Sequence, residues 1–136
     1  MYKILMVSHS ALCTGVLEGA KMILGDVRGV ECISLTEEGV EKFSDELNKK
    51  LLEIKDDKDG ILVLADLFGG SPFNRALMES INDPRIKIIT GVNLPMLIEA
   101  VMNIDSNLEE VYDNILNAGI EGIKTNKITK CDIEDE

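Results

Sequence analysis

Short apolar runs that alternate with longer amphipathic stretches constrain the fold of this chain more than any other feature. The runs are five or six residues long, are rich in aliphatic side chains, and span Lys3–Val7, Val30–Leu35, Gly60–Ala65 and Ile86–Thr90. Such runs are typical of buried strands. Since the third run is apolar on both faces, it suits the centre of a parallel sheet. The alternation predicts an α/β fold: a doubly wound, mainly parallel sheet with helices on both faces.

The stretches between and after these runs have the spacing of amphipathic helices. We expect helices at 11–24, from about 39, from 71, at 94–102, and from a capping box at 106–109 to about 123. The expected core faces are Leu12, Val16, Ala20, Ile23 and Leu24 in the first helix, Val40, Phe43, Leu47 and Leu51 in the second, and Leu108, Val111, Ile115 and Ile120 in the last. Ser71 is expected to cap the third helix, with Pro72 at its first position.

Length and composition suit one domain over residues 1–136, because 45% of the residues are hydrophobic. The tail Thr125–Ile133 alternates loosely between apolar and polar residues, so it is expected to be an edge strand or a partly ordered end. No run approaches the ~20 apolar residues of a membrane-spanning helix. The N-terminal run is also too short for the apolar core of a signal peptide.

The net charge of −11 excludes some classes of partner. An acidic chain lacks the basic footprint of a nucleic-acid-binding protein, and it is not attracted to an anionic membrane. The three cysteines, Cys13, Cys32 and Cys131, are widely spaced, which favours reduced thiols and a cytoplasmic location. Cys13 lies near His9, where a Cys–His nucleophile is conceivable, but a small buried core residue is the interpretation we favour.

The candidate site lies where three loops follow predicted strands, at 8–10, 66–74 and 91–95. In a parallel sheet the carboxyl ends of the strands meet at one edge, which is where ligands bind. His9 is the only histidine, and an imidazole can exchange a proton or a phosphoryl group near neutral pH. Asp66 can accept a hydrogen bond from one ring nitrogen and leave a lone pair on the other. The alternative for Asp66 is an ordinary turn cap.

Gly69, Gly70 and Ser71 lead into the third predicted helix. Glycines let backbone N–H groups approach an anion, and a helix N-terminus favours negative charge, so this segment predicts a phosphate cradle. An ordinary strand-to-helix turn is the alternative. The Walker and dinucleotide-binding patterns are absent, and His9 has no second histidine or cysteine pair beside it, so neither a metal nor a cofactor is expected. A phosphohistidine carrier fits these residues best.

Three motifs support this interpretation by resemblance. Ser8-His9 at the end of the first strand, Asp66-Leu-Phe-Gly-Gly-Ser-Pro-Phe-Asn74, and Gly91-Val-Asn-Leu-Pro-Met-Leu97 resemble the enzyme IIA component of the mannose family of the bacterial phosphoenolpyruvate-dependent sugar phosphotransferase system. The resemblance implies a homodimer in which a C-terminal strand lies antiparallel on the sheet and is exchanged between subunits. Residues 125–133 match that strand.

The resemblance also implies roles for particular residues. His9 would carry the phosphoryl group, Asp66 would hold its other ring nitrogen, and Ser71 would bind the phosphate. Gly70, in the glycine turn, and Ser10, beside His9, are further candidates for binding the phosphate. The donor would be the phosphocarrier protein HPr, and the acceptor a histidine of the enzyme IIB component. The chain departs from the family pattern at Leu67, which has no hydroxyl, and at Ser10, where glycine is often found. The transported sugar is not encoded here.

Two other functions fit part of the pattern. A receiver-like signalling module would be phosphorylated on Asp66, but receivers need an acidic pair for Mg²⁺ where this chain has Ser8-His9. A non-catalytic regulatory homologue would not need the intact His9–Asp66 pair.

The surface around His9 leaves two interpretations open. Four apolar residues near the loops, Phe68, Phe73, Leu94 and Met96, form either an apolar rim for docking HPr or part of the core. Acidity near the site would suit a basic HPr face.

Overall fold

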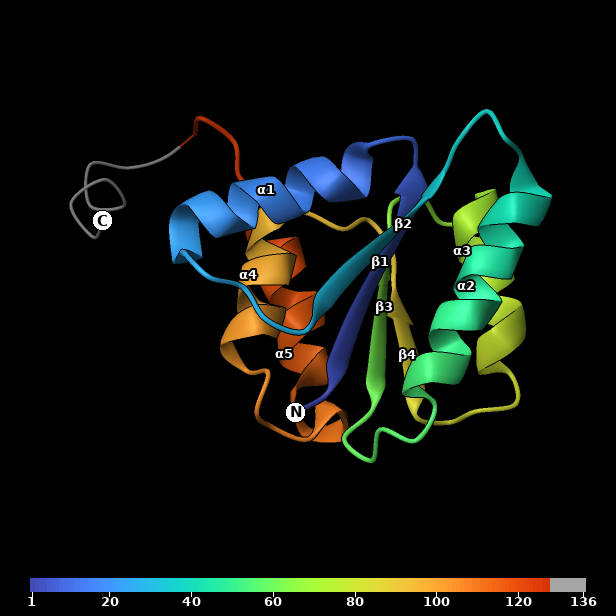
Figure 1. The fold of residues 1–136 in the computed structure, drawn as a ribbon. Coiled ribbons are helices and arrows are strands. Elements are labelled where there is room, and N and C mark those ends of the chain that lie inside the picture. Colours follow the sequence, from blue (N-terminus) through green and yellow to red (C-terminus); the bar gives the residue numbers. More distant parts are fainter. Residues whose placement is uncertain (128–136) are drawn as a thin grey trace.

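The computed structural model describes residues 1–127. Strands and helices alternate along most of this part of the chain (Figure 1). The strands are β1 (Lys3–His9), β2 (Val30–Leu35), β3 (Ile61–Ala65) and β4 (Ile86–Ile89), and the helices are α1 (Leu12–Leu24), α2 (Val40–Ile54), α3 (Ser71–Ser80), α4 (Leu94–Met102) and α5 (Leu108–Glu121). The four strands and five helices predicted before residue 124 are therefore present, with bounds that shift by at most two residues.

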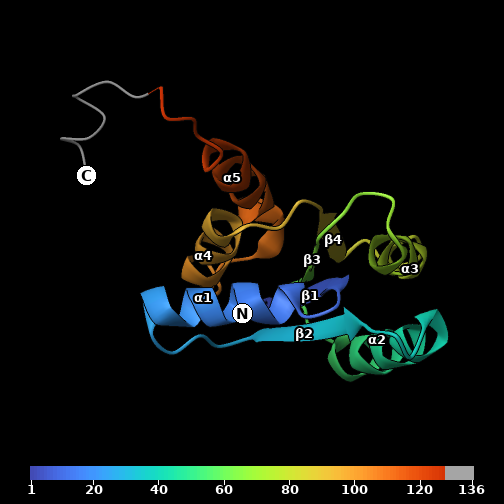
Figure 2. The same ribbon diagram turned by 90° about the horizontal axis from the view of Figure 1, so that it is seen from above.

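The four strands form a parallel sheet in the order β2-β1-β3-β4. Helices α1, α4 and α5 cover one face and α2 and α3 cover the other, as the view from above shows (Figure 2). The predicted doubly wound α/β fold is confirmed. All five residues of β3 are buried, as expected for a strand at the centre of the sheet with helices on both sides.

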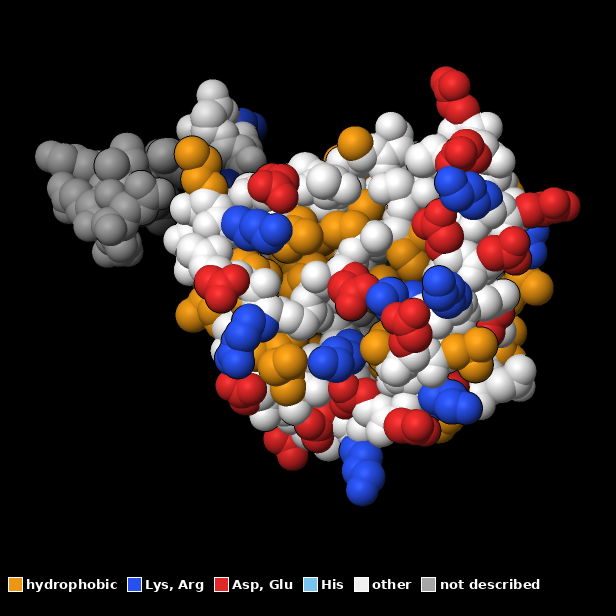
Figure 3. All heavy atoms as spheres, viewed as in Figure 1, with side chains coloured by type: hydrophobic (Ala, Val, Ile, Leu, Met, Phe, Trp, Pro, Cys, Tyr) orange, Lys and Arg blue, Asp and Glu red, His pale blue; other side chains and the backbone are white. Residues whose placement is uncertain are grey.

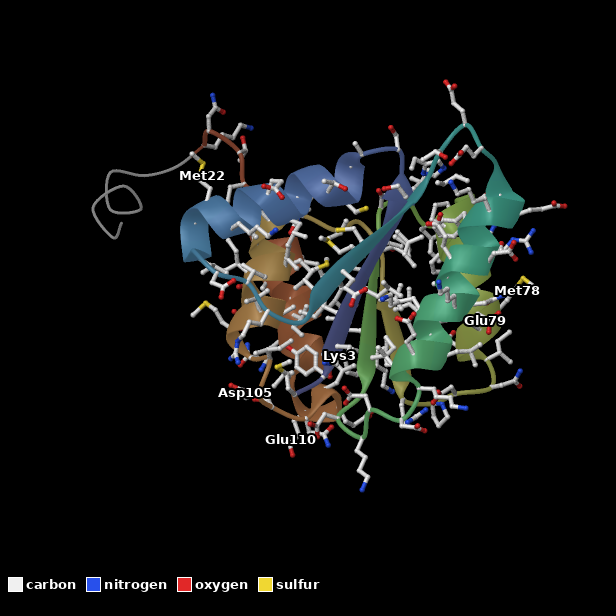
Figure 4. All side chains as sticks on the ribbon, in the orientation of Figure 1. Lys3, Met22, Met78, Glu79, Asp105 and Glu110 are labelled. Atoms are coloured by element: carbon white, nitrogen blue, oxygen red, sulfur yellow. The ribbon has the colours of Figure 1, made fainter. Side chains whose placement is uncertain are left out.

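The core faces of two helices differ from the prediction. In α1, Cys13 and Ala20 are buried, whereas Leu12 and Ile23 are exposed. The face through Cys13 and Ala20 meets the sheet, and Leu12 and Ile23 each precede by one residue a position on that face. Met22 is likewise exposed at the end of α1 (Figure 4).

In α5, Ile120 is exposed and Gly119 is buried in its place. Gly119 allows α5 to approach α4 closely, because a Cβ atom there would lie only 2.6 Å from the Cε atom of Met96. Asn107, not Ser106, caps α5: its side chain accepts a hydrogen bond from the Glu109 N–H at 3.0 Å. The expected capping box is therefore wrong by one residue.

The surface that Figure 3 shows carries both signs of charge, and acidic and basic side chains intermix over α2. Ion pairs form there, such as Lys42–Glu46 and Lys50–Glu53. Within residues 1–127 no helix is both long and apolar enough to cross a bilayer. The predicted tail strand at 125–133 falls mostly outside the described residues, and 125–127 are not in a strand.

Candidate functional site

The site lies between the carboxyl ends of β1 and β3, the two central strands. The chain leaves β1 through α1 to β2, then returns through α2 to β3 on the other side of β1. The direction of winding reverses between these strands, and such a reversal opens a crevice where ligands bind in α/β sheets. Val7 and Ala65 are paired across the two strands. His9 and Asp66 therefore emerge side by side.

Asp66 binds His9 in two places. Its Oδ2 atom lies 2.8 Å from the His9 backbone nitrogen and 2.8 Å from the ring Nδ1, while Oδ1 accepts a hydrogen bond from the Leu67 N–H at 2.8 Å. Only 7% of the Asp66 side chain is exposed, against 48% for His9. Burial raises the pKa of Asp66, but the hydrogen bonds from His9 and Leu67 outweigh it and hold this pKa below its usual value. The carboxyl group is therefore ionised.

An ionised Asp66 fixes the tautomer of the imidazole. A carboxylate can only accept hydrogen bonds, so Nδ1 carries the proton and Nε2 holds a lone pair. No hydrogen bond to Nε2 occurs within residues 1–127. The arrangement thus presents a nucleophilic nitrogen on a half-exposed ring.

The glycine turn lies against the imidazole. The Gly70 N–H donates to the Leu67 carbonyl at 3.0 Å, so this amide closes the turn. Asn74 reinforces it, because its Nδ2 donates to the Gly69 carbonyl at 3.1 Å. A Cβ atom on Gly70 would lie 2.9 Å from the His9 Cε1. Gly70 therefore provides room for the ring, a role that the phosphate-cradle prediction did not include.

Ser71 is the first residue of α3, and Gly70, not Ser71, occupies the cap position. The helix therefore starts one residue earlier than predicted, with Pro72 at its second position. The N–H groups of a first helical turn have no acceptor inside the helix, and proline has none to satisfy. The start of α3 consequently offers an anion the N–H groups of Ser71 and Phe73 and the Ser71 hydroxyl. The phosphate-binding role of Ser71 stays a prediction.

Buried Ser8 stabilises the turn that follows His9. The Ser8 Oγ accepts a hydrogen bond from the Cys13 N–H at 2.8 Å, and the Ser10 N–H donates to the Leu35 carbonyl at 2.7 Å. Ser10 has a φ of 50°, which lies in the left-handed region that glycine adopts without strain. The departure from glycine at Ser10 therefore adds backbone strain, and its exposed side chain remains a predicted phosphate contact.

The apolar surface near the site differs from the predicted one. Phe73 and Met96 are buried in the core, Leu94 is half-buried, and only Phe68 is largely exposed, at 76%. Leu67, beside Asp66, and Leu12, three residues after His9, are exposed as well. We define the apolar rim as Leu12, Leu67 and Phe68. Closeness in the sequence to His9 and Asp66 was the signal that would have found Leu12 and Leu67.

The third loop supports the helices. Asn93 caps α4 by accepting a hydrogen bond from the Met96 N–H, and its Nδ2 donates to the Gly119 carbonyl at 3.0 Å. The Val92 N–H donates to the Ala65 carbonyl, which places this loop beside the end of β3.

Cys13 is fully buried, as the core interpretation expects.

Replacing Gly70 with alanine is expected to slow reactions at His9 by about 10- to 100-fold, because the new methyl group displaces the imidazole from its hydrogen bond with Asp66. Gly70 has a φ of −72°, which alanine adopts without strain, so thermal stability should stay unchanged. Gly69→Ala is the matched control. Its φ of 84° strains alanine by about 1–2 kcal/mol, but within residues 1–127 the added Cβ meets no atom within 4 Å apart from its chain neighbours. A Gly69→Ala protein that reacts more slowly at His9 than the Gly70→Ala protein would contradict this role for Gly70.

Comparisons with known proteins agree with the site. The family model described as PTS system fructose IIA component, where PTS denotes the phosphotransferase system, matches residues 3–116. The chain is 32% identical over 123 residues to the "PTS system mannose-specific EIIAB component" of Escherichia coli, covering 88% of this chain but 38% of that protein. It is 28% identical over 102 residues to the "PTS system fructose-specific EIIA component" of Bacillus subtilis, covering 74% of this chain and 69% of that one.

Solved structures give the same result. The phosphotransferase system component EIIA from Streptococcus agalactiae superposes with a TM-score of 0.82 at 31% identity, covering 92% of this chain and 97% of that one. The mannose/sorbose-specific IIA subunit from Enterococcus faecalis has a TM-score of 0.81 at 28% identity, covering 94% and 96%. The chain therefore belongs to the mannose and fructose type of enzyme IIA components of the sugar phosphotransferase system.

Proposed function

We propose that this protein is a phosphoryl carrier in sugar uptake, which accepts a phosphoryl group from phospho-HPr on Nε2 of His9 and passes it to a histidine of the enzyme IIB component. The observation that carries the proposal is the 2.8 Å contact between Nδ1 of His9 and Oδ2 of Asp66. It leaves Nε2 as the nucleophilic atom. HPr acts in the cytoplasm, and a cytoplasmic location is part of the same proposal.

The transfer needs little rearrangement of the site. The Nε2 lone pair attacks the phosphorus atom, the bond from phosphorus to the donor imidazole breaks, and the donor nitrogen keeps that electron pair. Because Nδ1 keeps its proton, the phosphorylated ring of His9 gains positive charge, which the buried Asp66 carboxylate stabilises. The hydroxyls of Ser71 and Ser10 and the start of α3 supply donors for the phosphoryl oxygens. Leu67 contributes no hydroxyl to them.

Labelling the protein from phosphoenolpyruvate through enzyme I and HPr tests the proposal. The described site predicts a phosphoramidate, which is labile in acid and stable in base. Since the chain has one histidine, a phosphohistidine can form only at residue 9. A label that is labile in base would instead be an acyl phosphate and would contradict the proposal. No label at all would favour the regulatory homologue.

The receiver-like alternative fits the site less well. Both oxygens of the Asp66 carboxylate already accept hydrogen bonds, from His9 and from Leu67, and 7% of the side chain is exposed. A nucleophilic carboxylate needs a free oxygen facing solvent, and Asp66 does not present one.

Two features at the site suit a basic partner with an apolar centre, as HPr docking requires. The exposed residues of the apolar rim lie on the segments that follow His9 and Asp66 in the chain. The loop between β2 and α2 carries the exposed acidic residues Glu37 and Glu38. This loop rises at the same edge of the sheet as His9 (Figures 1 and 3), because the Ser10 N–H binds the Leu35 carbonyl at the end of β2. Apolar contact at the centre with charge at the rim is typical of such interfaces.

We also propose that the protein forms a homodimer in which residues 125–133 of one copy pair with β4 of the other. Within residues 1–127 β4 has one neighbouring strand, so its outer edge is open. A groove of about 480 Å³ runs along it, lined by residues that include Phe68, Phe73, Leu77, Tyr112 and Leu116. Ile120 near the end of α5 and Ile123 just after it are exposed apolar residues as well. A long apolar edge of this kind favours pairing with a further strand.

The wild-type protein is expected to elute in size-exclusion chromatography with light scattering at twice 15.0 kDa. The double substitution Ile128→Pro and Ile133→Pro removes two backbone donors from the tail and should shift the protein to monomer. Leu52→Ser, an exposed apolar residue on α2, is the control and should leave the dimer intact. A monomeric wild-type protein, or a proline variant that stays dimeric, would contradict strand exchange.

A further inference from the structure

Ser8 is the only polar residue that is buried in the part of the chain that the structure describes. It lies in β1 directly before His9, and its side chain points toward α1, on the opposite face of the sheet from the imidazole. Burying a hydroxyl costs free energy unless hydrogen bonds compensate for it. The hydrogen bonds of Ser8 therefore define what this hydroxyl does.

The Ser8 hydroxyl caps α1 from outside the helix. The helix begins at Leu12, and its cap residue, Ala11, has no side-chain oxygen for the free N–H groups of the first turn. The Oγ of Ser8 takes this place, because it accepts a hydrogen bond from the Cys13 N–H at 2.8 Å. The end of β1 is thus tied to the start of α1, across the turn that follows His9.

The same hydroxyl also holds the backbone of His9. The Ser8 Oγ lies 3.3 Å from the His9 carbonyl oxygen and 3.4 Å from that of Ser10, and it donates its one proton to these acceptors. On the other side of the residue, the His9 N–H donates to the Asp66 Oδ2 at 2.8 Å. Both backbone groups of His9 are therefore fixed, one by the carboxylate that also binds the ring and the other by Ser8.

The turn that Ser8 supports is strained at Ser10, whose φ of 50° is uncommon for a residue other than glycine. Such a conformation persists only where the surrounding structure holds it. Two hydrogen bonds do so here: the one from the Ser8 Oγ, and the one from the Ser10 N–H to the Leu35 carbonyl at 2.7 Å. Without the Ser8 hydroxyl the turn would relax, and the backbone of His9 would move with it.

We propose that Ser8 is a positioning residue for the imidazole of His9, because its hydroxyl fixes the backbone from which the ring reaches Asp66. With that backbone fixed, Nδ1 meets Oδ2 at 2.8 Å, and Nε2 stays the free nitrogen. A displacement of about 1 Å at a reacting group can slow a reaction about 10²-fold. The expected effect on rate rests on the proposed phosphoryl transfer, whereas the effect on the ring does not.

Two readouts on Ser8→Ala test this role. At a pH where the imidazole is neutral, the ring-nitrogen NMR signals of the one histidine should show the tautomer protonated on Nδ1 in the wild type. In Ser8→Ala these signals should shift toward a mixture of tautomers. The rate of transfer at saturating phospho-HPr should also fall about tenfold, with the KM for phospho-HPr unchanged. Ser8→Thr keeps the hydroxyl and should restore both readouts.

An alanine variant with wild-type NMR signals and a wild-type rate would reduce Ser8 to a cap of α1 and overturn the proposal. If the alanine protein does not fold, Ser8→Cys gives the same comparison, because a thiol is close in size and forms only weak hydrogen bonds. If the wild type takes no label from phospho-HPr, the NMR signals still decide the role of Ser8. Failure of the carrier proposal and failure of this one are therefore distinguishable.

Leu51→Ala separates positioning from stability. Leu51 is buried near the end of α2, in the core on the other face of the sheet from Ser8. Its truncation leaves a cavity and destabilises the fold without removing a hydrogen bond of the turn. Transfer by this variant should stay within about twofold of the wild type at a temperature where both are folded. A fall equal to that of Ser8→Ala would show that lost stability alone slows transfer, and would overturn the proposal.

Discussion

Replacing His9 with alanine is expected to abolish phosphorylation of this protein by phospho-HPr. No second imidazole exists in the chain to take over the phosphoryl group. The expected loss is at least about 10³-fold in the rate of labelling, as for removal of a covalent nucleophile. The measurement is the rate at which label from phosphoenolpyruvate enters the protein at fixed enzyme I and HPr.

The fold should survive this substitution, so the loss can be assigned to chemistry. The His9 ring is half-exposed, and Asp66 still accepts hydrogen bonds from the backbone N–H groups of residues 9 and 67. We therefore expect the free energy of unfolding to change by no more than about 1 kcal/mol, which is the typical contribution of one hydrogen bond. Label that persists in the alanine variant and is labile in base would identify Asp66 as the acceptor and refute the carrier proposal.

The contact between His9 and Asp66 followed from the sequence, because it depends on topology. Two apolar runs that become neighbouring parallel strands bring the residues after them to one edge of the sheet, whatever the details of packing. The bounds of β2 and α4 were also predicted to the residue, since turns and prolines mark them clearly. Strong local signals and one general rule of sheet topology account for these successes.

The missed features depend on packing between elements that are distant in the sequence. The exposure of Ile120 follows from the close approach of Gly119 to Met96, and Gly70 gives room to the ring of His9. Helical periodicity cannot show either contact, because it describes one element at a time.

Replacing Asp66 with asparagine is expected to slow phosphoryl transfer by about 10²- to 10⁴-fold while the fold is kept. Oδ2 accepts from both the His9 N–H and Nδ1–H, and Oδ1 accepts from the Leu67 N–H. The asparagine side chain would put one acceptor, its carbonyl oxygen, and one donor, its NH₂ group, where Asp66 has two acceptor oxygens. If its NH₂ group faces His9, Nδ1 must become the acceptor, and the proton moves to Nε2, which loses its nucleophilic lone pair.

If the amide adopts the opposite orientation, its NH₂ group meets the Leu67 N–H, and the negative charge is lost in either case. The phosphorylated ring then lacks the carboxylate that stabilises its positive charge, so transfer slows even with the correct tautomer. Steady-state transfer measured at saturating HPr separates this effect from weaker docking. A rate within about twofold of the wild type would show that Asp66 does not orient the imidazole.

Asp83→Asn is the matched control. Asp83 also has a pKa below its usual value, because of its hydrogen bonds and ion pair with Arg85, but it lies at the other end of the sheet, before β4. Each lowered pKa contributes stability that is present above the unfolded-state value near 3.8 and is lost as pH falls through the lower folded-state value. Both variants should therefore weaken the loss of stability below pH ~4, whereas only Asp66→Asn should slow transfer. Equal transfer rates in the two variants would reduce Asp66 to a structural carboxylate.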